Sequence, residues 1–325
     1  MADSAYLLAL ALQHRYNSNN MNLKKISWVL PIFNEEELIP TLYKELQNLQ
    51  SQIKEKYETE LVFVDDGSKD KSLEMLSKLF EQDKTVKVLA FSRNFGHQMA
   101  ITAGLDAATG DAIIFMDTDL QDPPSVCLEL IEKWEAGYDV AYAKRRSRKD
   151  SFLKKFTAYI FYRLLQKFAD ISIPEDTGDF RLISRQVANT LRQFPERHRF
   201  IRGLVSYIGF KQVAVLFDRQ ERKAGTTGYS LKKMIKLAED ALTGFSLAPI
   251  MIVGVSGTLL AMVGGVGAII GLVMQNVTLV ALSYATVLTA IILIALSTIG
   301  QYIGRTYQQV QGRPLYIVKS KLEHN

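Results

Sequence analysis

The chain has 325 residues, enough for one large domain or two smaller ones, and its length alone leaves the fold class open. Its 39 Lys and Arg residues against 34 Asp and Glu residues give a mildly basic balance, which does not call for a nucleic-acid partner. The single cysteine, Cys127, excludes an intrachain disulfide and a thiolate zinc cluster. We interpret Cys127 as a packing residue in a protein of a reducing compartment.

Residues 1–23 are interpreted as a flexible N-terminal extension. Residues 5–12 are apolar but too short to cross a membrane, and no small-residue cleavage pattern follows them, so a signal peptide is not predicted. Met21, after an Asn-rich stretch, is a candidate for the natural start.

Residues 24–228 alternate between strand-like and helix-like segments. Apolar runs predict strands at 26–33, 61–64, 86–91 and 112–116, with helices between them. This alternation predicts an α/β fold with a mainly parallel sheet, in which ligands bind beyond the carboxyl ends of the strands. Polar residues follow each predicted strand: Asn34, Asp65, Asp66, Ser92, Arg93, Asp117 and Asp119.

Asp117-Thr118-Asp119 is the most informative of these strand ends. Two carboxylates at alternate positions can project into one cleft, and Gln121 adds an amide oxygen. Such hard oxygen ligands suit Mg²⁺ or Mn²⁺, which in turn would bind the phosphates of a nucleotide. Asp-x-Asp triplets are common in surface turns, but the apolar strand directly before this one favours a metal site.

A basic stretch follows, with only Asp150 of opposite charge and the largely apolar residues 156–165 after it. Its members are Lys144, Arg145, Arg146, Arg148, Lys149, Lys154 and Lys155. Such a segment can lie on an anionic membrane and bind phosphate through guanidinium groups. A solvated loop without a role is the alternative, and an RNA-binding surface is disfavoured.

Asp179 and the histidines are less informative. Asp179 stands two residues before Arg181, and a structural ion pair between the two is one interpretation of it. His97 follows Phe95-Gly96 at an expected helix start, and we interpret it as a cap or pocket-wall residue. The other histidines lack metal-ligand spacing.

Residues 241–304 contain no Asp, Glu, Lys or Arg, which is a membrane signature. One helix of this length would be about three times the thickness of the hydrocarbon core, so we predict two transmembrane helices within 247–304 and a reversal at Gln275 and Asn276. A soluble core hairpin is disfavoured because buried helices rarely run so far without a charge. Basic residues flank the pair, which predicts that both ends are cytoplasmic.

Three features border or lie within the predicted spans. Residues 229–246 have the spacing of an interfacial amphipathic helix, with a surface helix of the preceding domain as the alternative. Gly267 and Gly271 suit close helix packing, which allows a homo-oligomer through the membrane helices. Residues 305–325 are expected to form a cytoplasmic tail.

Several different short motifs are distributed along the chain. They are VLPIFNE at 29–35, VDDGS at 64–68, SRNFG at 92–96, MDTDLQDPP at 116–124, GDFRL at 178–182, RFIRG at 199–203, RKAG at 222–225, GQYIG at 300–304 and RPLY at 313–316. This series resembles the family 2 GT-A glycosyltransferases, and within them the polyprenyl-phosphate sugar transferases, which include bactoprenol glucosyltransferases and dolichol-phosphate mannose synthases. The resemblance covers nearly all of the chain after Met21, and the two predicted spans favour the bactoprenol group. The stretch 226–230 departs from the family pattern because it lacks a lysine that relatives carry there.

The resemblance implies a GT-A, Rossmann-like sheet flanked by helices, with a C-terminal two-helix transmembrane hairpin. It implies transfer of a hexose, expected to be glucose from UDP-glucose, to a polyprenyl phosphate such as undecaprenyl phosphate, with Mg²⁺ or Mn²⁺. Because a phosphate can attack directly and no second carboxylate has the spacing for a covalent glycosyl intermediate, we expect a single displacement with inversion. The implied roles are nucleotide-sugar binding by Pro31, Phe33, Glu35, Asp66, Arg93 and Asp117; metal binding by Asp119 and Gln121; catalysis by Asp117, Asp119 and Asp179; and acceptor phosphate binding by Arg145, Arg146, Arg148 and Arg222.

Three other functions compete with this one. The first is a dolichol-phosphate-mannose-type synthase that uses GDP-mannose. The second is a processive polysaccharide synthase, which would need more spans and usually a Gln-x-x-Arg-Trp motif that neither Trp28 nor Trp134 belongs to. The third is a non-catalytic membrane scaffold, which has no reason to keep acidic residues at successive strand ends.

Overall fold

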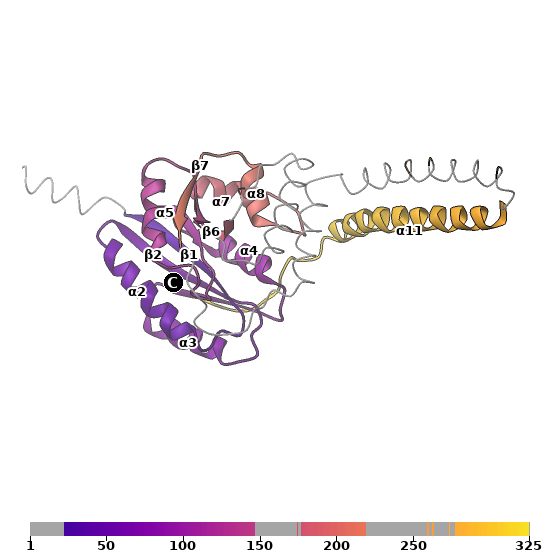
Figure 1. Cartoon of the computed structure of the whole chain (residues 1–325). Coiled ribbons are helices and arrows are strands. Elements are labelled where there is room, and N and C mark those ends of the chain that lie inside the picture. The colour runs from indigo at the N-terminus through magenta and orange to yellow at the C-terminus, as the bar shows by residue number, and fades with distance from the viewer. Residues whose placement is uncertain are drawn as a thin grey trace, which may run out of the picture.

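The computed structural model describes residues 23–146, 174, 177–218, 259, 262, 273 and 277–324. They form an eight-stranded sheet with helices on both faces and a long helix that projects away from it (Figure 1). The strand order is β7-β5-β6-β4-β1-β2-β3-β8. The predicted α/β fold with a mostly parallel sheet is therefore confirmed.

The centre of the sheet is parallel, as the apolar runs predict. Its strands are β1 (Lys24–Ile32), β2 (Tyr57–Asp65), β3 (Val86–Phe91) and β4 (Ala112–Phe115). The helices after β1, β2 and β3 are α2 (Ile39–Ile53), α3 (Ser72–Gln82) and α4 (His97–Ala107). Because β1 pairs in parallel with β2 and β4, and β2 with β3, the carboxyl ends of all four strands lie at one edge.

Three more strands continue the sheet beyond β4, namely β5 (Val140–Arg145), β6 (Thr177–Ser184) and β7 (Gln212–Phe217). The helices of this half are α5 (Val126–Glu135), α7 (Arg185–Arg192) and α8 (Ile201–Tyr207). β6 runs antiparallel to both β4 and β5. The start of β6 therefore lies beside the carboxyl end of β4.

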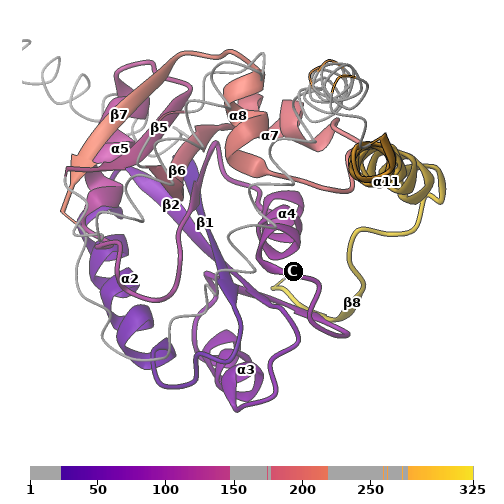
Figure 2. The same ribbon diagram turned by 45° about the vertical axis from the view of Figure 1, so that its right-hand side comes forward.

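Both faces of the sheet are covered, which explains why its central strands read as unbroken apolar runs. Trp28 and Leu30 of β1 pack with α2, α3 and α5, whereas Val29 packs on the other face with α4, α7 and α8. Figure 2 shows α2 and α4 on opposite sides of β1 and β2. Gly104 allows α4 to lie directly on β1, because a Cβ there would come within 2.2 Å of a Val29 methyl group.

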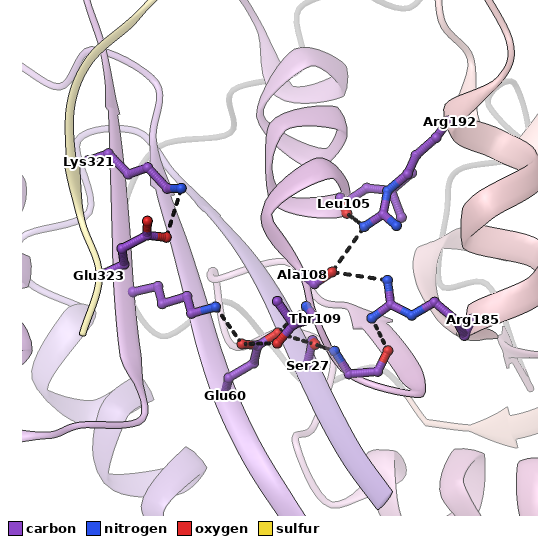
Figure 3. Close-up of polar contacts among 11 residues, drawn as sticks. Ser27, Glu60, Leu105, Ala108, Thr109, Arg185, Arg192, Lys321 and Glu323 are labelled. Carbon is purple, nitrogen blue, oxygen red and sulfur yellow. Dashed lines mark hydrogen bonds and ion pairs between the residues drawn. The ribbon is translucent and has the colours of Figure 1, made fainter. Parts of the chain in front are cut away.

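A buried carboxylate connects neighbouring strands near their amino ends, opposite the carboxyl edge of the sheet (Figure 3). Glu60 accepts hydrogen bonds from the Ser27 hydroxyl and from the Thr109 backbone and hydroxyl, and it pairs with Lys87 at 2.9 Å. The same view shows the Arg185 guanidinium donating a hydrogen bond to the backbone oxygen of Ala108, the residue that follows α4. Cationic donors at a helix C-terminus satisfy carbonyl groups that would otherwise lack partners. We infer that this edge is structural.

Helix α11 (Val277–Val310) is the projecting helix of Figure 1. Its 34 residues extend about 51 Å at ~1.5 Å per residue, more than the ~30 Å of a hydrocarbon core. Apolar side chains such as Leu296 and Ile303 are exposed along it, which suits lipid better than water. It is the one helix among the described residues that is long and apolar enough to span a membrane.

The start of α11 coincides with the second predicted span, directly after the expected reversal at Gln275 and Asn276. The first predicted span, the interfacial helix at 229–246 and the N-terminal extension lie almost wholly outside the described residues. The described part of the chain therefore shows one candidate spanning helix, and the predicted hairpin is not shown.

The C-terminal tail returns to the sheet. β8 (Val318–Leu322) pairs antiparallel with β3 and becomes the outermost strand on that side of the sheet. Tyr316 stacks on Phe91 and donates a hydrogen bond to Asp106 of α4. At the end of α11, Gln309 donates to the backbone oxygen of Pro195. Residues 318–322, predicted to belong to a separate tail, are thus part of the main sheet.

Candidate active site

Two carboxylates meet at the carboxyl edge of the sheet because of the β4–β6 register. Phe115 lies opposite Arg181 in this antiparallel pair. Asp117 comes two residues after Phe115 and Asp179 two residues before Arg181, so the two aspartates face each other. His97, the first residue of α4, lies between them, with its Nε2 atom 3.3 Å from Asp117 Oδ1 and 3.5 Å from Asp179 Oδ2.

The imidazole and the two carboxylates hold opposite charges at the mouth of the site. Burial works against a charged His97, but its contact with Asp179 and the negative charge of Asp117 outweigh this and raise its pKa to about 9. Burial raises the pKa of Asp117, helped by the charges of Asp179 and Asp119 and opposed by His97. About a third of the Asp117 and His97 side chains is exposed, which leaves both accessible to a ligand.

Asp179 is almost fully buried and is held in its ionised form. Burial by itself would disfavour the charge, but Arg202 and His97 outweigh it and keep the pKa of Asp179 well below its usual range. The Arg202 Nε atom lies 3.4 Å from Asp179 Oδ1, and Gln98 donates a 2.8 Å hydrogen bond to Oδ2. Arg181, the ion-pair partner considered from the sequence, donates to the carbonyl of Gly178, and its charge also helps to lower the pKa of Asp179.

Three residues of this cluster escaped the sequence-based assignment. His97 was interpreted only as a cap or wall residue, and neither Gln98 nor Arg202 was given a role. Their partners lie far away along the chain, since Gln98 and Asp179 are separated by 81 residues. Two motifs were the available signals. SRNFG ends directly before His97, and RFIRG contains Arg202.

The Asp-x-Asp segment is held in an unusual conformation after β4. Thr118, between the two aspartates, is buried and donates to the backbone oxygen of Pro31. Asp119 accepts from the backbone N–H of Gln121 at 3.1 Å. Leu120 has a positive φ of 54°, a left-handed conformation that is costly for a branched side chain and that concentrates at functional sites.

Asp119 is suited to an open divalent-cation site, one that the protein does not enclose. Mg²⁺ in nucleotide enzymes is usually bound by one or two carboxylates, several waters and the substrate phosphates. Asp119 is a hard oxygen donor on a partly exposed loop, as such a site requires. Among the described residues no three His, Cys, Asp or Glu side chains form a closed metal cluster.

The residues expected to bind the nucleotide lie along the ends of β1, β2 and β3. Phe33 and Arg93 are exposed, Glu35 is half-buried and Pro31 is buried. Asp66 is buried and accepts hydrogen bonds from the Asn94 side chain and from the backbone N–H groups of the next two residues.

Asp66 thus holds the 94–96 loop, which leads directly into His97. Gly67 has a φ of 71°, and a Cβ there would lie 2.5 Å from the Arg93 backbone. This close approach brings the ends of β2 and β3 together. A role of Asp66 in contacting the base stays a prediction.

The residues expected to bind the acceptor phosphate are only partly described. Arg145 ends β5 and is half-buried, and its Nη2 atom lies 3.9 Å from where a Cβ on Gly178 would be. Arg145 is therefore beside the segment that carries Asp179. Arg146 is exposed and pairs with Asp218 at 3.6 Å. Arg148 and Arg222 lie outside the described residues.

Comparison with known proteins agrees with this arrangement. Residues 27–192 match the model of "Glycosyl transferase family 2". The chain is 48% identical to an uncharacterized glycosyltransferase, YkcC, of Bacillus subtilis (strain 168), over 90% of this chain and 93% of the relative. It is 42% identical to the prophage bactoprenol glucosyl transferase homolog of Escherichia coli (strain K12), over 91% and 98%.

A third relative is the bactoprenol glucosyl transferase of Shigella phage SfII, with 41% identity over 93% of this chain and 99% of that protein. The matched family segment holds most of β1, all of β2 to β4, the Asp-x-Asp loop, His97 and Asp179. Similarity of this extent, together with acidic residues gathered at the carboxyl edge of the sheet, establishes that the chain is a glycosyltransferase and belongs to glycosyl transferase family 2.

Proposed function

We propose that the protein transfers glucose from UDP-glucose to a polyprenyl phosphate, such as undecaprenyl phosphate, at the cytoplasmic face of a membrane. The observation that carries the proposal is the cluster of Asp117, His97, Asp179 and Arg202 at the carboxyl edge of the sheet. It occurs in a chain that is about 41% identical to proteins named bactoprenol glucosyl transferase over most of their length.

The proposed reaction is a single displacement. A phosphate monoester carries ~1.5 to 2 negative charges at neutral pH and is itself a nucleophile, so no strong general base is required. One of its oxygens attacks the anomeric carbon of glucose while the bond from that carbon to the UDP oxygen breaks. In-line attack inverts the configuration and gives a β-linked glucosyl phosphate from an α-linked donor, with UDP as the leaving group.

The charged residues have complementary tasks in this reaction. Donor and acceptor are both anionic, so their approach requires nearby cations. Arg202 and His97 supply positive charge beside Asp179, and Arg145, with Arg146, Arg148 and Arg222, is proposed to hold the acceptor phosphate. Asp119 and Gln121 would hold Mg²⁺ or Mn²⁺, which neutralises the departing diphosphate when bound.

The position of β8 supports the proposed membrane topology. β8 and β3 belong to one sheet, so the two ends of the intervening chain lie on the same side of any membrane. If α11 crosses the bilayer, the chain must cross once more between residues 218 and 277. We assign that second crossing to the apolar residues 247–274, and the flanking basic residues support a cytoplasmic catalytic domain.

The decisive experiment is a transfer assay with the full-length protein in detergent. UDP-glucose with Mg²⁺ and a short polyprenyl phosphate should yield an organic-extractable, β-linked glucosyl phosphate, identified by NMR. GDP-mannose in place of UDP-glucose should give no product. Transfer from GDP-mannose alone would overturn the donor in favour of a mannose synthase, and an α-linked product would overturn the single displacement.

A further inference from the structure

The side-chain amide of Gln98 connects two parts of the site. Gln98 is the second residue of α4, and its Nε2 atom donates to Asp179 Oδ2 at 2.8 Å. Its Oε1 atom accepts from the backbone N–H of Ile201 at 2.9 Å. A carboxylate can only accept and a backbone N–H can only donate, so these two contacts fix the orientation of the amide.

Both partners of Gln98 belong to the Asp179–Arg202 ion pair or adjoin it. Asp179 uses its Oδ1 atom for Arg202, whose Nε atom lies 3.4 Å away. Ile201, held by the Gln98 oxygen, directly precedes Arg202 at the start of α8. A single amide thus constrains the carboxylate and the segment that carries its cation.

His97 cannot replace this contact. Its Nε2 atom is shared between Asp117 and Asp179 and is 3.5 Å from Asp179 Oδ2, a longer distance than the 2.8 Å of the Gln98 bond. The carboxylate torsion of an aspartate is broad, so a buried Asp179 without a short donor on Oδ2 could rotate away from its reactive orientation. Hydrogen bonds to charged groups are also among the stronger ones in proteins.

We propose that Gln98 is a positioning residue for sugar transfer, and that it acts through its hydrogen bond to Asp179. This inference rests on the proposed function in one respect, because it assigns Asp179 to the reacting end of the site. In this proposal Gln98 acts on the reaction through Asp179 and not through a substrate contact of its own. Its removal should therefore lower kcat and leave the binding of the nucleotide unchanged.

Two substitutions separate the contacts of Gln98. Gln98→Met keeps the length of the side chain and loses both hydrogen bonds. Gln98→Glu keeps an acceptor for Ile201 and replaces the donor to Asp179 by a negative oxygen. Thr102→Val is the control, because the buried Thr102 hydroxyl lies one turn further along α4 and bonds only to the helix backbone at Gln98.

For Gln98→Met we expect kcat to fall about 10- to 100-fold, with the Kd for UDP, measured by calorimetry, within about threefold of the unaltered enzyme. Gln98→Glu should be at least as impaired, and Thr102→Val should be close to the unaltered enzyme. Unchanged kcat in Gln98→Met would overturn the proposal. The proposal would also be overturned if Gln98→Met lost activity while Gln98→Glu kept the kcat of the unaltered enzyme. Only the contact with Ile201, which anchors α8, would then matter.

Hydrolysis of the nucleotide sugar in the absence of lipid is measured for the same variants. In this proposal the reaction depends on Asp179, and it requires no polyprenyl phosphate. If the unaltered enzyme hydrolyses a donor and does not use the lipid, the proposed acceptor is wrong, and the role of Gln98 is decided on hydrolysis by the same criteria. A fall in thermal stability without a fall in kcat per folded molecule would show a purely structural role and would also overturn the inference.

Discussion

His97 Nε2 lies 3.3 Å from Asp117 Oδ1, so the first residue of α4 is in contact with the second residue after β4. The same nitrogen also approaches Asp179, and the imidazole therefore separates two carboxylates that would otherwise repel each other. Three segments from different parts of the chain depend on this contact for their arrangement.

Replacing His97 by Ala should leave Asp117 and Asp179 without the imidazole between them. We expect kcat for glucosyl transfer to fall about 10- to 100-fold, because a charged hydrogen-bonding partner of both carboxylates is lost. Steady-state kinetics would measure this. His198→Ala is the matched control, because His198 contacts Gln308 of α11 and lies outside the cluster; an equal loss in both variants would argue against a specific role for His97.

Asp119→Ala should abolish transfer and leave the fold intact. Asp119 is partly exposed, so its side chain contributes little to the core, and the thermal midpoint should stay within a few degrees. Transfer with Mg²⁺ and with Mn²⁺ would be compared for this variant and for Glu129→Ala, which removes an exposed carboxylate of α5. Full activity of Asp119→Ala would refute the metal assignment.

Arg145 and Arg146 should differ in their effect on the lipid substrate. Arg145 lies beside Gly178 near Asp179, whereas Arg146 points to Asp218. Arg145→Ala should raise the apparent KM for polyprenyl phosphate about tenfold or more, as expected for a lost charged hydrogen bond, with the KM for UDP-glucose nearly unchanged. Arg146→Ala should raise the KM for polyprenyl phosphate less. Replacement of Arg145, Arg146 and Arg148 together by Ala should raise it most.

Equal losses for both substrates in Arg145→Ala would contradict an acceptor role. A larger effect from Arg146→Ala than from Arg145→Ala would show that the exposed part of the basic stretch binds the lipid phosphate.

Glu60 should make stability depend on pH at the structural edge of the sheet. Burial alone would raise its pKa, but Lys87, Ser27 and Thr109 outweigh this, so the folded pKa lies below the unfolded one. The ionised pair therefore stabilises the fold above the unfolded pKa of ~4.3, and this contribution is lost as the pH falls through the still lower folded value.

Glu60→Gln should accordingly destabilise the protein by roughly 1–3 kcal/mol at pH 7 and by clearly less near pH 3.5, as measured by denaturant unfolding at both pH values. Glu74→Gln, which removes the exposed partner of Lys78, should have little effect at either pH. An equal loss for Glu60→Gln at both pH values would rule out ionisation as the cause.

Labelling can test the membrane topology, because the single native cysteine is buried and gives little background. Cysteines introduced at the exposed Lys56 and Lys319 should react with an impermeant maleimide from the same, cytoplasmic side. A cysteine at Gln275 should react only from the opposite side. Reaction of Lys319→Cys and Lys56→Cys from different sides would be incompatible with β8 pairing with β3.

The sequence predicts the centre of this fold well and its periphery poorly. The strands β1 to β4 are buried on both faces, so each is an apolar run that local pattern reveals. β8 has only Val318 and Leu322 as apolar residues among lysines and serine, which is typical of a protected edge strand, and nothing near it in sequence indicates its partner.

The site follows the same division. Asp117 and Asp119 stand directly after an apolar strand, where pattern and chemistry point to a ligand. His97, Gln98 and Arg202 acquire their meaning only from Asp179, which the antiparallel return of β6 brings to them. Local sequence does not encode that return, so these partners could not be derived from it.

The docking of β8 also has a consequence for biogenesis. Tyr316 and Asp106, which hydrogen bond in the finished protein, are 210 residues apart, and the outer edge of β3 is closed only by a strand synthesised long after it. On the ribosome, α11 emerges before β8, so its insertion into a membrane can precede completion of the sheet. Until then β3 is an open edge, prone to pairing with other chains. The catalytic domain would thus pass through a state in which its sheet is incomplete at β3 while α11 is already available for membrane integration.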